Sequence, residues 1–526
     1  MHVIPPVRKT LIALAVSAFL SGCSVTPSPI SHDSSLKQAA DSADTLQKET
    51  APVTGAIDLS EAFARAVKHN REARLKAFES VVQQRQIAVD EFDMLPELAA
   101  KAGYTQRSNY AASASVAFDG NDPDPVGSDP NYSVSSDKTS TNASIGATWD
   151  ILDFGLSYFR AQQQADRFLI AKERERKVVH TLMQDVRYAY YRAVSAERLL
   201  GKINPLIEQA KAALADSEEI ERRRARSPMD ALTYQRELLE TLRMLQDLRS
   251  ELMPAKAELA TLMGMNPATP FELADVDSPD FQRPDLALDV AAMERTALVK
   301  RPELKEAQYQ NRITRKEVRS SFLQLFPSLS LNAGSYYNDS DYLKNNDWIS
   351  AGVGLNWNLM NVFKYGQLEK LNDLKVAAGE QQALATAMSV ISQVHIANIQ
   401  FAESQQTFQL ADRYFDVAQR IKQQVEIQRK TESAAELDLI REELNALLSE
   451  LRRDVAYAGL QNSFGRIMSS MGLDPIPDNF GDMTLTQLAE AFEQRMRQWQ
   501  QGQLPMVTQD EIKAAQTHAA ETQESS

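Results

Sequence analysis

The sequence predicts a mainly helical protein that also carries membrane-type β-strands and is built from two repeats of one plan. Three observations predict this fold. One half of the chain matches the other, each half has two segments that alternate apolar and polar residues, and long stretches rich in Gln, Ala, Leu, Glu and Arg lack proline, including all of 328–474. Glycine and proline are sparse, at 19 and 21 of 526 residues, as expected of a chain dominated by helix.

The N-terminal residues have the features of a secretory signal, predicted to cover 1–22. Arg8 and Lys9 precede an apolar run from Leu11 to Leu20, which is too short to span a bilayer as a helix but suits a signal peptide. The run ends at Cys23, the only cysteine of the chain. The sequence Leu-Ser-Gly-Cys resembles the bacterial lipobox, which implies cleavage before Cys23 and acylation of it; an ordinary core cysteine is the alternative. Ser24, in place of an aspartate, favours delivery to the outer membrane.

Composition excludes several classes of function. The net charge of −14, with no basic face, argues against nucleic-acid binding. A single cysteine excludes an internal disulfide framework and a cysteine-based metal cluster. The histidines stand in no metal-ligand spacing and beside no nucleophile motif, and no phosphate-binding glycine loop occurs. We therefore expect no enzyme activity, no cofactor and no metal site. The six histidines are His2, His32, His69, His180, His395 and His518.

The internal repeat is the most informative feature. Two shifts align the halves, and they differ by 23 residues, so one extra loop lies in the first half between residues 96 and 146. We place a linker at 23–57, repeats at 58–280 and 281–480, and a short helix with a disordered polar tail at 481–526. A shift of 231 residues places Glu72 on Glu303 and Gly103 on Gly334, and a shift of 208 places Gly146 on Gly354, Trp149 on Trp357, Asp230 on Asp438 and Gly264 on Gly472.

Each repeat is expected to begin with a helix, at 58–91 and 289–323, followed by a strand hairpin, at 97–152 and 328–360. The hairpin segments have one apolar face and one small, amide-rich face, and Trp149 and Trp357 lie near the ends of the apolar faces. A membrane β-barrel needs this pattern, with aromatic residues at the interface. An ordinary half-buried hairpin fits the alternation equally well. The aspartate-rich first loop lacks EF-hand spacing, so we expect a solvated surface loop.

A pair of long helices completes each repeat, at 155–264 and 366–472. Their first members, at 155–226 and 366–430, would extend about 100 Å at 1.5 Å per residue, with a kink expected near Gly201 and Pro205. Helices of this length must pack along one another. Gly264 and Gly472 are the natural ends of the returning helices.

Together these features resemble the outer membrane efflux protein family, the TolC-like channels, over Asp58 to about Pro475. The resemblance implies a homotrimer in which each protomer gives four strands to a twelve-stranded outer-membrane β-barrel, continued by a long periplasmic α-barrel. It also implies a periplasmic adaptor protein and an inner-membrane transporter as partners. The residues independently require several copies, because four strands cannot close a barrel and an open edge in lipid is prohibitive.

In that family an acidic residue follows the turn at each periplasmic helix tip, and the matching positions here are Asp230 and Asp438. Carboxylates that converge on a symmetry axis can set selectivity and bias opening; an ordinary favourable contact with the helix dipole is the alternative. The chain departs from the family at Thr233 and Arg441, where a second acidic residue is common, and it lacks the turn glycine. The basic tip residues are adaptor-contact candidates or a solvated turn, and they include Arg224, Arg226, Arg429 and Lys430.

The predicted function is a passive, lipid-anchored outer-membrane conduit of a tripartite export system that extends into the periplasm and is gated at its helix tips. The cargo is either small toxic molecules or a polypeptide, as in type I secretion. The alternative is a periplasmic coiled-coil scaffold lipoprotein without channel activity, which explains the helices but not two matched amphipathic hairpins.

Overall fold

The computed structural model describes residues 27–48, 52–123, 131–223, 228–274, 276, 281–284, 286, 289–430, 436–477 and 480–524. Cys23, Arg224 and Arg226 lie outside these residues. The chain divides into two compact units, Met1–Pro52 and Val53–Ser526. Within the first unit, part of the expected linker forms a polar helix, α2 (His32–Lys48), which has no buried residue. The other helices and strands of the described residues lie in the second unit.

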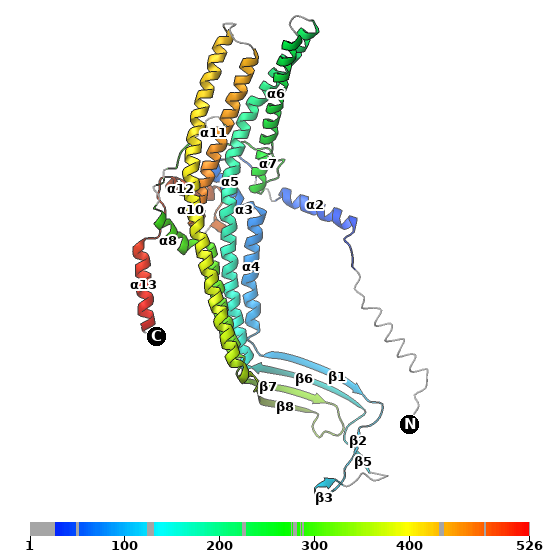
Figure 1. Ribbon diagram of the computed structural model, residues 1–526. Coiled ribbons are helices and arrows are strands. Elements are labelled where there is room, and N and C mark those ends of the chain that lie inside the picture. The colour runs from blue at the N-terminus through cyan, green and yellow to red at the C-terminus, as the bar shows by residue number, and fades with distance from the viewer. Residues whose placement is uncertain are drawn as a thin grey trace. The chain divides into compact units, whose positions relative to one another are not determined.

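Two long helices dominate this unit (Figure 1). They are α5 (Ile151–Arg222) and α10 (Asn361–Lys430), with 72 and 70 residues, or roughly 105 Å each. The helix α5 continues through Gly201 and Pro205. Ile203 and Leu206 are buried on either side of the proline, and this packing offsets the hydrogen bond that proline cannot donate. The chain returns along α6 (Pro228–Leu252) and α7 (Ala255–Leu262) in the first repeat and along α11 (Glu436–Ser470) in the second.

The shorter helices of each repeat are broken where single helices were expected. The first repeat has α3 (Leu59–His69) and α4 (Arg71–Phe92), and the second has α8 (Val290–Lys300) and α9 (Pro302–Leu323). Asn70 and Arg301 stand at the breaks, both extended with ψ 131°. The Asn70 side chain accepts from the amides of α4, as capping residues do, and Pro302 disfavours a helical conformation at Arg301.

The strands of the two hairpins form one antiparallel sheet. It contains β1 (Glu97–Gln106), β6 (Thr139–Asp150), β7 (Ser328–Asn338) and β8 (Asp347–Asn356) in the order β1-β6-β7-β8. The central pair, β6 with β7, joins the repeats and places Gly146 opposite Gly334. The long first loop forms two small ladders, β2 (Ala112–Ala114) with β5 (Tyr132–Val134) and β3 (Phe118–Asp119) with β4 (Asp122–Pro123).

The main core lies midway along the long helices. Phe63 of α3, Tyr190 of α5 and Phe464 of α11 are among its largest buried side chains. The predicted short helix, α12 (Leu485–Gln500), follows a 3-10 turn, η1 (Phe480–Asp482), and packs on α3 with the rings of Phe63 and Phe492 5.8 Å apart. Among the described residues, no helix has both the length and the apolar character needed to cross a membrane.

The tail that we expected to be disordered contains a helix, α13 (Gln509–Glu524). Thr508 and Glu511 form a reciprocal pair at its start, because the Thr508 amide donates to the Glu511 carboxylate at 2.7 Å and the Glu511 amide donates to the Thr508 hydroxyl at 3.3 Å. This capping box satisfies two backbone donors that a helix start otherwise leaves unpaired. The polar composition suggested disorder because it offers no apolar face, but it also contains good helix formers.

The helices of the two repeats correspond in the structure at the same shifts that align the sequence. Bounds of α3 and α4 recur in α8 and α9 at the shift of 231, and those of α6 and α7 recur in α11 at the shift of 208. Gly264 and Gly472 both have φ +70° at the ends of the returning helices, as predicted. Each also lies against the preceding short helix, because a Cβ would meet His69 in one repeat and Lys300 in the other.

Candidate functional site

The sheet presents one continuous apolar face. Its register places Leu98 of β1 opposite Ala147 of β6, which in turn lies opposite Ala333 of β7. Side chains of one face therefore line up across all four strands. Several large apolar members are exposed to an extent that a water-soluble sheet avoids. These are Leu98 at 72%, Ile145 at 54%, Ile349 at 85%, Val353 at 71% and Leu355 at 70%.

The opposite face is mostly small and polar, and the rings of Tyr336 and Trp348 stack on it near the β7–β8 hairpin loop. This face carries Ser144, Thr148, Ser350 and similar residues, and Gly146 lies opposite Gly334. A Cβ on Gly334 would lie 3.0 Å from the backbone oxygen of Ile145, so a side chain there would crowd the neighbouring strand. A sheet with one apolar face and one small, polar face is suited to separating lipid from water.

The two tryptophans lie where the sheet meets the helices. Trp149 is near the end of β6, and its ring contacts Phe154 of α5 edge-on, with centroids 5.7 Å apart. Trp357 follows β8, is 46% exposed, and donates from Nε1 to the Leu325 carbonyl at 3.0 Å. The half-exposed indole of Trp357 has an apolar body and a polar tip, which suits a membrane interface, whereas the Nε1 of Trp149 is buried and has no hydrogen-bond partner among the described residues.

The edges of the sheet and of the helical layer lie on the same two sides. In the described part of the chain β1 and β8 each have a neighbour on one side alone. Contacts between successive helices give the order α4, α5, α9, α10 near the sheet and α6, α5, α11, α10 towards the tips. Since α4 leads into β1 and β8 leads into α10, one side of the molecule is formed by α6, α4 and β1 and the other by α10 and β8 (Figure 1).

Both sides carry exposed apolar stripes. On each helix most of the exposed apolar side chains fall within about a third of the helical circumference, at 3.6 residues per turn. We call these the α4 stripe and the α10 stripe. The α4 stripe is Leu75, Phe78, Val82, Val89 and Phe92, and the α10 stripe is Leu374, Leu384, Met388, Ile396, Ile399, Leu410, Tyr414, Val417 and Ile421.

The two predicted aspartates lie near the starts of the returning helices α6 and α11. Asp230 is exposed in the first turn of α6. Asp438 lies on α11 and accepts from Arg441 at 3.0 Å, so the residue that departs from the family pattern is its partner. Arg429 and Lys430 end α10 on the approach to the same tip.

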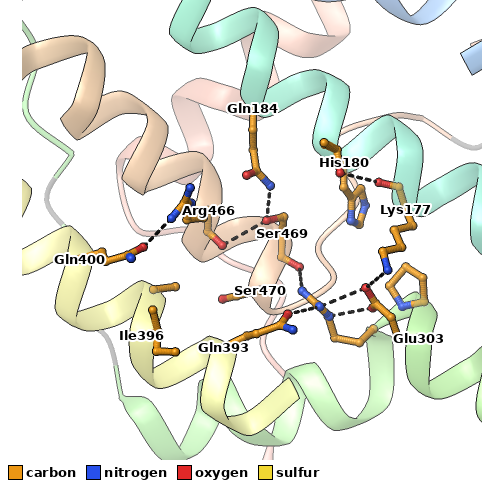
Figure 2. A pocket seen from close by; sticks show the side chains of 14 residues that line it. Lys177, His180, Gln184, Glu303, Gln393, Ile396, Gln400, Arg466, Ser469 and Ser470 are labelled. Atoms are coloured by element: carbon orange, nitrogen blue, oxygen red, sulfur yellow. Dashed lines mark hydrogen bonds and ion pairs between the residues drawn. The ribbon is translucent and has the colours of Figure 1, made fainter. Parts of the chain in front are cut away.

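A polar cavity of about 330 Å³ lies between α5, the start of α9, α10 and the end of α11 (Figure 2). Arg301 spans it, pairing with Glu303 at 3.0 Å and donating to the Ser469 carbonyl at 2.9 Å. Lys177 reaches Glu303 at 3.3 Å, and Arg466 donates to Gln400 at 2.8 Å. Each of these three cations has a partner, and residues of both repeats line the cavity. Pro302 after Arg301 is the sequence signal for the helix break at this cavity, and a single helix was predicted across it.

Beside the cavity, the loop after α11 is fixed by a buried histidine. Nε2 of His180 lies 2.6 Å from the Asp474 carboxylate, and Arg176 donates to the same carboxylate at 2.7 Å. Burial by itself would raise the pKa of Asp474, but the hydrogen bonds and charges of His180 and Arg176 outweigh it and lower the pKa. Among the described residues, no three His, Cys, Asp or Glu side chains gather as metal ligands would.

Comparison with known proteins identifies the fold. No protein-family model and no curated protein matches the sequence. Solved structures do match. The outer-membrane channel OprN shares 17% identity, with a TM-score of 0.57, over 79% of this chain and 89% of that one. The Campylobacter jejuni CmeC outer membrane channel shares 13%, with a TM-score of 0.60, over 83% and 89%. The open state of the Neisseria gonorrhoeae MtrE outer membrane channel shares 15%, with a TM-score of 0.57, over 79% and 89%.

The chain therefore has the fold of these outer-membrane channels. The resemblance to the TolC-like channels that the sequence indicated is confirmed at the level of the fold.

Proposed function

We propose that this chain is one subunit of a trimeric outer-membrane export channel, a passive conduit from the periplasm to the exterior. Cys23 carries the lipid anchor, and the channel works with a periplasmic adaptor and an inner-membrane transporter. The observation that supports this function best concerns the two sides of the subunit. Unpaired strand edges and exposed apolar helix stripes lie on the same two sides of the subunit, and the sheet between them has an exposed apolar face.

Joining copies into a closed ring would pair the strand edges and cover the apolar helix stripes at the same time. The strands alternate in direction along β1-β6-β7-β8, so β8 of one copy runs antiparallel to β1 of the next. Every backbone donor and acceptor at the edges is then paired, which lipid requires. Two copies would give an eight-stranded barrel whose interior side chains fill it. Three copies give twelve strands and room for a lumen lined by the small, polar face.

The helix tips supply the gate in this proposal. In a ring of three, Asp230 and Asp438 each occur three times around the axis, so their charges favour cations and repel one another. The basic residues Arg429 and Lys430 at the end of α10 offer docking charges for an acidic adaptor surface. The exported cargo is a small toxic molecule or a polypeptide, and the transporter supplies the driving force.

Planar-bilayer recording of the purified full-length protein tests the proposal. We expect unitary conductance from a species whose native mass equals three chains. The proposal is wrong if the protein is monomeric, or if a stable trimer inserts and gives no conductance. The second result would instead favour a periplasmic scaffold. Heat-denatured protein in the same detergent is the matched control, because it excludes detergent artefacts.

A further inference from the structure

Two aromatic side chains interrupt the small, polar face of the sheet. Tyr336 of β7 lies directly opposite Trp348 of β8 on that face, and their rings stack with centroids 5.6 Å apart and planes 13° from parallel. The other described residues of this face are Gly, Ala, Ser, Thr, Asn, Asp, Glu and Lys. Within the four described strands, the stacked pair is therefore the one large apolar surface of the polar face.

The aromatic pair lies near the loop that joins β7 to β8, at the end of the sheet away from the long helices (Figure 1). The Tyr336 ring lies over the neighbouring glycine, because a Cβ on Gly334 would be 3.2 Å from it. Trp348 is 43% exposed although it stacks on Tyr336. Part of the indole therefore faces the water that a closed ring of copies would enclose.

Holding a hairpin of this fold together does not require the two rings. At the shifts of 231 and 208 the counterparts of Tyr336 and Trp348 are Thr105 and Ser140. Thr105 and Ser140 are directly opposed in the pair of β1 with β6, so the first hairpin has two small hydroxyl side chains at the corresponding place. The aromatic pair belongs to one of two hairpins of the same plan, which indicates a role specific to that hairpin.

An ammonium group shares the row of the aromatic pair. The register places Lys101 of β1 opposite Ser144 of β6, and Ser144 opposite Tyr336. Lys101, Ser144 and the two rings thus follow one another across the sheet on a single face. Lys101 is exposed, and it forms no ion pair within the described part of the chain. Its charge is therefore available to a ligand on this face.

Small side chains leave a space between the ammonium group and the rings. The strands β1 and β7 lie on either side of β6, about 9.6 Å apart at about 4.8 Å per strand. Ser144 is at the bottom of this space, and Gly146 follows it on the same face of β6. Because Trp348 covers one side of the Tyr336 ring, the other side of that ring faces this space. A flat ring needs about 3.5–4 Å to stack, so one fits above Ser144 between Tyr336 and Lys101.

We propose that Lys101, Ser144 and the Tyr336–Trp348 pair form a binding site for a small aromatic anion on the inner face of the channel. The aromatic ring of the ligand stacks on Tyr336, and its carboxylate or sulfonate pairs with the Lys101 ammonium. This inference rests on the proposed function and deepens it, because it assigns flat aromatic molecules with a negative charge as the cargo in place of a polypeptide.

The carboxylates at the helix tips do not act on this site. Asp230 and Asp438 lie at the far ends of long helices of 72 and 70 residues, roughly 105 Å at 1.5 Å per residue. Charges in water are screened beyond about 8 Å at physiological ionic strength. The tips therefore bias opening, and the site around Lys101 selects among the molecules that pass.

Planar-bilayer recording of the full-length protein with 2-naphthoate tests the site. We expect 2-naphthoate to block the current reversibly, because a bound ring narrows the conduit. Two further probes separate the contacts: cyclohexanecarboxylate has the charge without an aromatic ring, and 2-naphthylmethanol has the rings without a charge. Each should reach half-block at a concentration at least about threefold higher, since each loses one of the two contacts.

Substitutions to the residues of the other hairpin test the two contacts separately. Tyr336→Thr should raise the half-blocking concentration of 2-naphthoate about fivefold, and Tyr336→Phe should leave it unchanged because the ring is retained. Lys101→Asn, which copies the counterpart Asn332, should raise it about threefold. Lys101→Asn should not change the half-blocking concentration of 2-naphthylmethanol, whereas a general change in the shape of the conduit would change both.

A third substitution leaves the ammonium group and both rings in place. Ser144→Leu fills the space above β6, so the block by 2-naphthoate should be lost although the channel still conducts. Thr148→Leu is the matched control, because Thr148 lies on the same face of β6 four residues away, and it should keep the block. A conducting trimer that 2-naphthoate does not block, or an equal loss of block in the two leucine variants, overturns the site. A trimer without conductance would contradict the proposed function as well.

Discussion

Gly472 lies against the backbone of Lys300 so closely that a Cβ atom would stand 2.7 Å from the lysine carbonyl carbon. Its counterpart Gly264 lies against His69 in the same way. Each returning helix therefore ends at the point where the short helices of its repeat are broken. Glycine is required at each of these positions for two reasons: the φ of +70° and the close approach of the neighbouring backbone, which leaves no room for a Cβ.

We predict that Gly472→Ala destabilises the folded protein by at least about 2 kcal/mol, because the left-handed conformation and the overlap both oppose a methyl group. Thermal unfolding of the purified protein measures this change. Gly201→Ala is the matched control, since Gly201 lies inside α5 and a Cβ there meets nothing within 4 Å. That substitution should stabilise by about 0.5–1 kcal/mol. Equal effects of both would show that the close approach to Lys300 does not constrain the fold.

Asp474 should make stability depend on acid pH. Its pKa is lowered below the ordinary value of 3.8. The carboxylate therefore stabilises the fold above pH 3.8, and the contribution is lost as the pH falls through the lower folded pKa. Asp474→Asn should reduce stability at neutral pH and flatten the dependence below pH 3.8, as measured by the unfolding midpoint across pH. Asn in place of the exposed Asp482 is the control. An unchanged acid slope in Asp474→Asn would contradict the assignment.

Arg187 is a buried cation held by aromatic rings. Its guanidinium carbon lies 5.4 Å from the centre of the Phe63 ring and 5.2 Å from that of Phe464, and it donates to the sulfur of Met496. Burial lowers the pKa of Arg187 to about 10, so the fold bears a desolvation cost.

We expect Arg187→Met to leave the unfolding midpoint unchanged or to raise it, because a side chain of similar length fills the space without a charge. Arg187→Ala should destabilise by about 3 kcal/mol through the cavity that it leaves. If Arg187→Met were as destabilising as Arg187→Ala, the charge itself would hold α3, α11 and α12 together.

The tip aspartates should set ion selectivity if the chain forms a channel. We predict that the double variant Asp230→Asn/Asp438→Asn reduces cation preference several-fold, because six carboxylates are removed from around the axis of a trimer. Reversal potentials in a salt gradient measure the preference. Arg441→Gln is the complementary variant. It removes the cation that pairs with Asp438, so it should increase cation preference. Unaltered reversal potentials in both variants would place the aspartates outside the conduction path.

The sequence alone determined the hairpin strands, the long helices and their duplication. Period-two alternation located the strands, because a pleated strand exposes its two faces in turn. The absence of proline from 328–474 located the second pair of long helices, and composition located the first, which contains Pro205. Gly264 followed by Asn266-Pro267, and Gly472 followed by Asp474-Pro475, located the ends of the returning helices. All of these are local signals, so they can be seen without knowing which segments touch.

Only the tertiary structure decided which apolar residues of the helices are buried and which are exposed. Leu374 and Val390 are both apolar residues of α10, yet the first is 68% exposed and the second 1%. The difference arises because α9 and α11 cover one face of α10 and leave another face bare. No local pattern shows which face a neighbour will cover. For the same reason the cavity around Arg301 and the aromatic setting of Arg187 emerged only when distant helices were brought together.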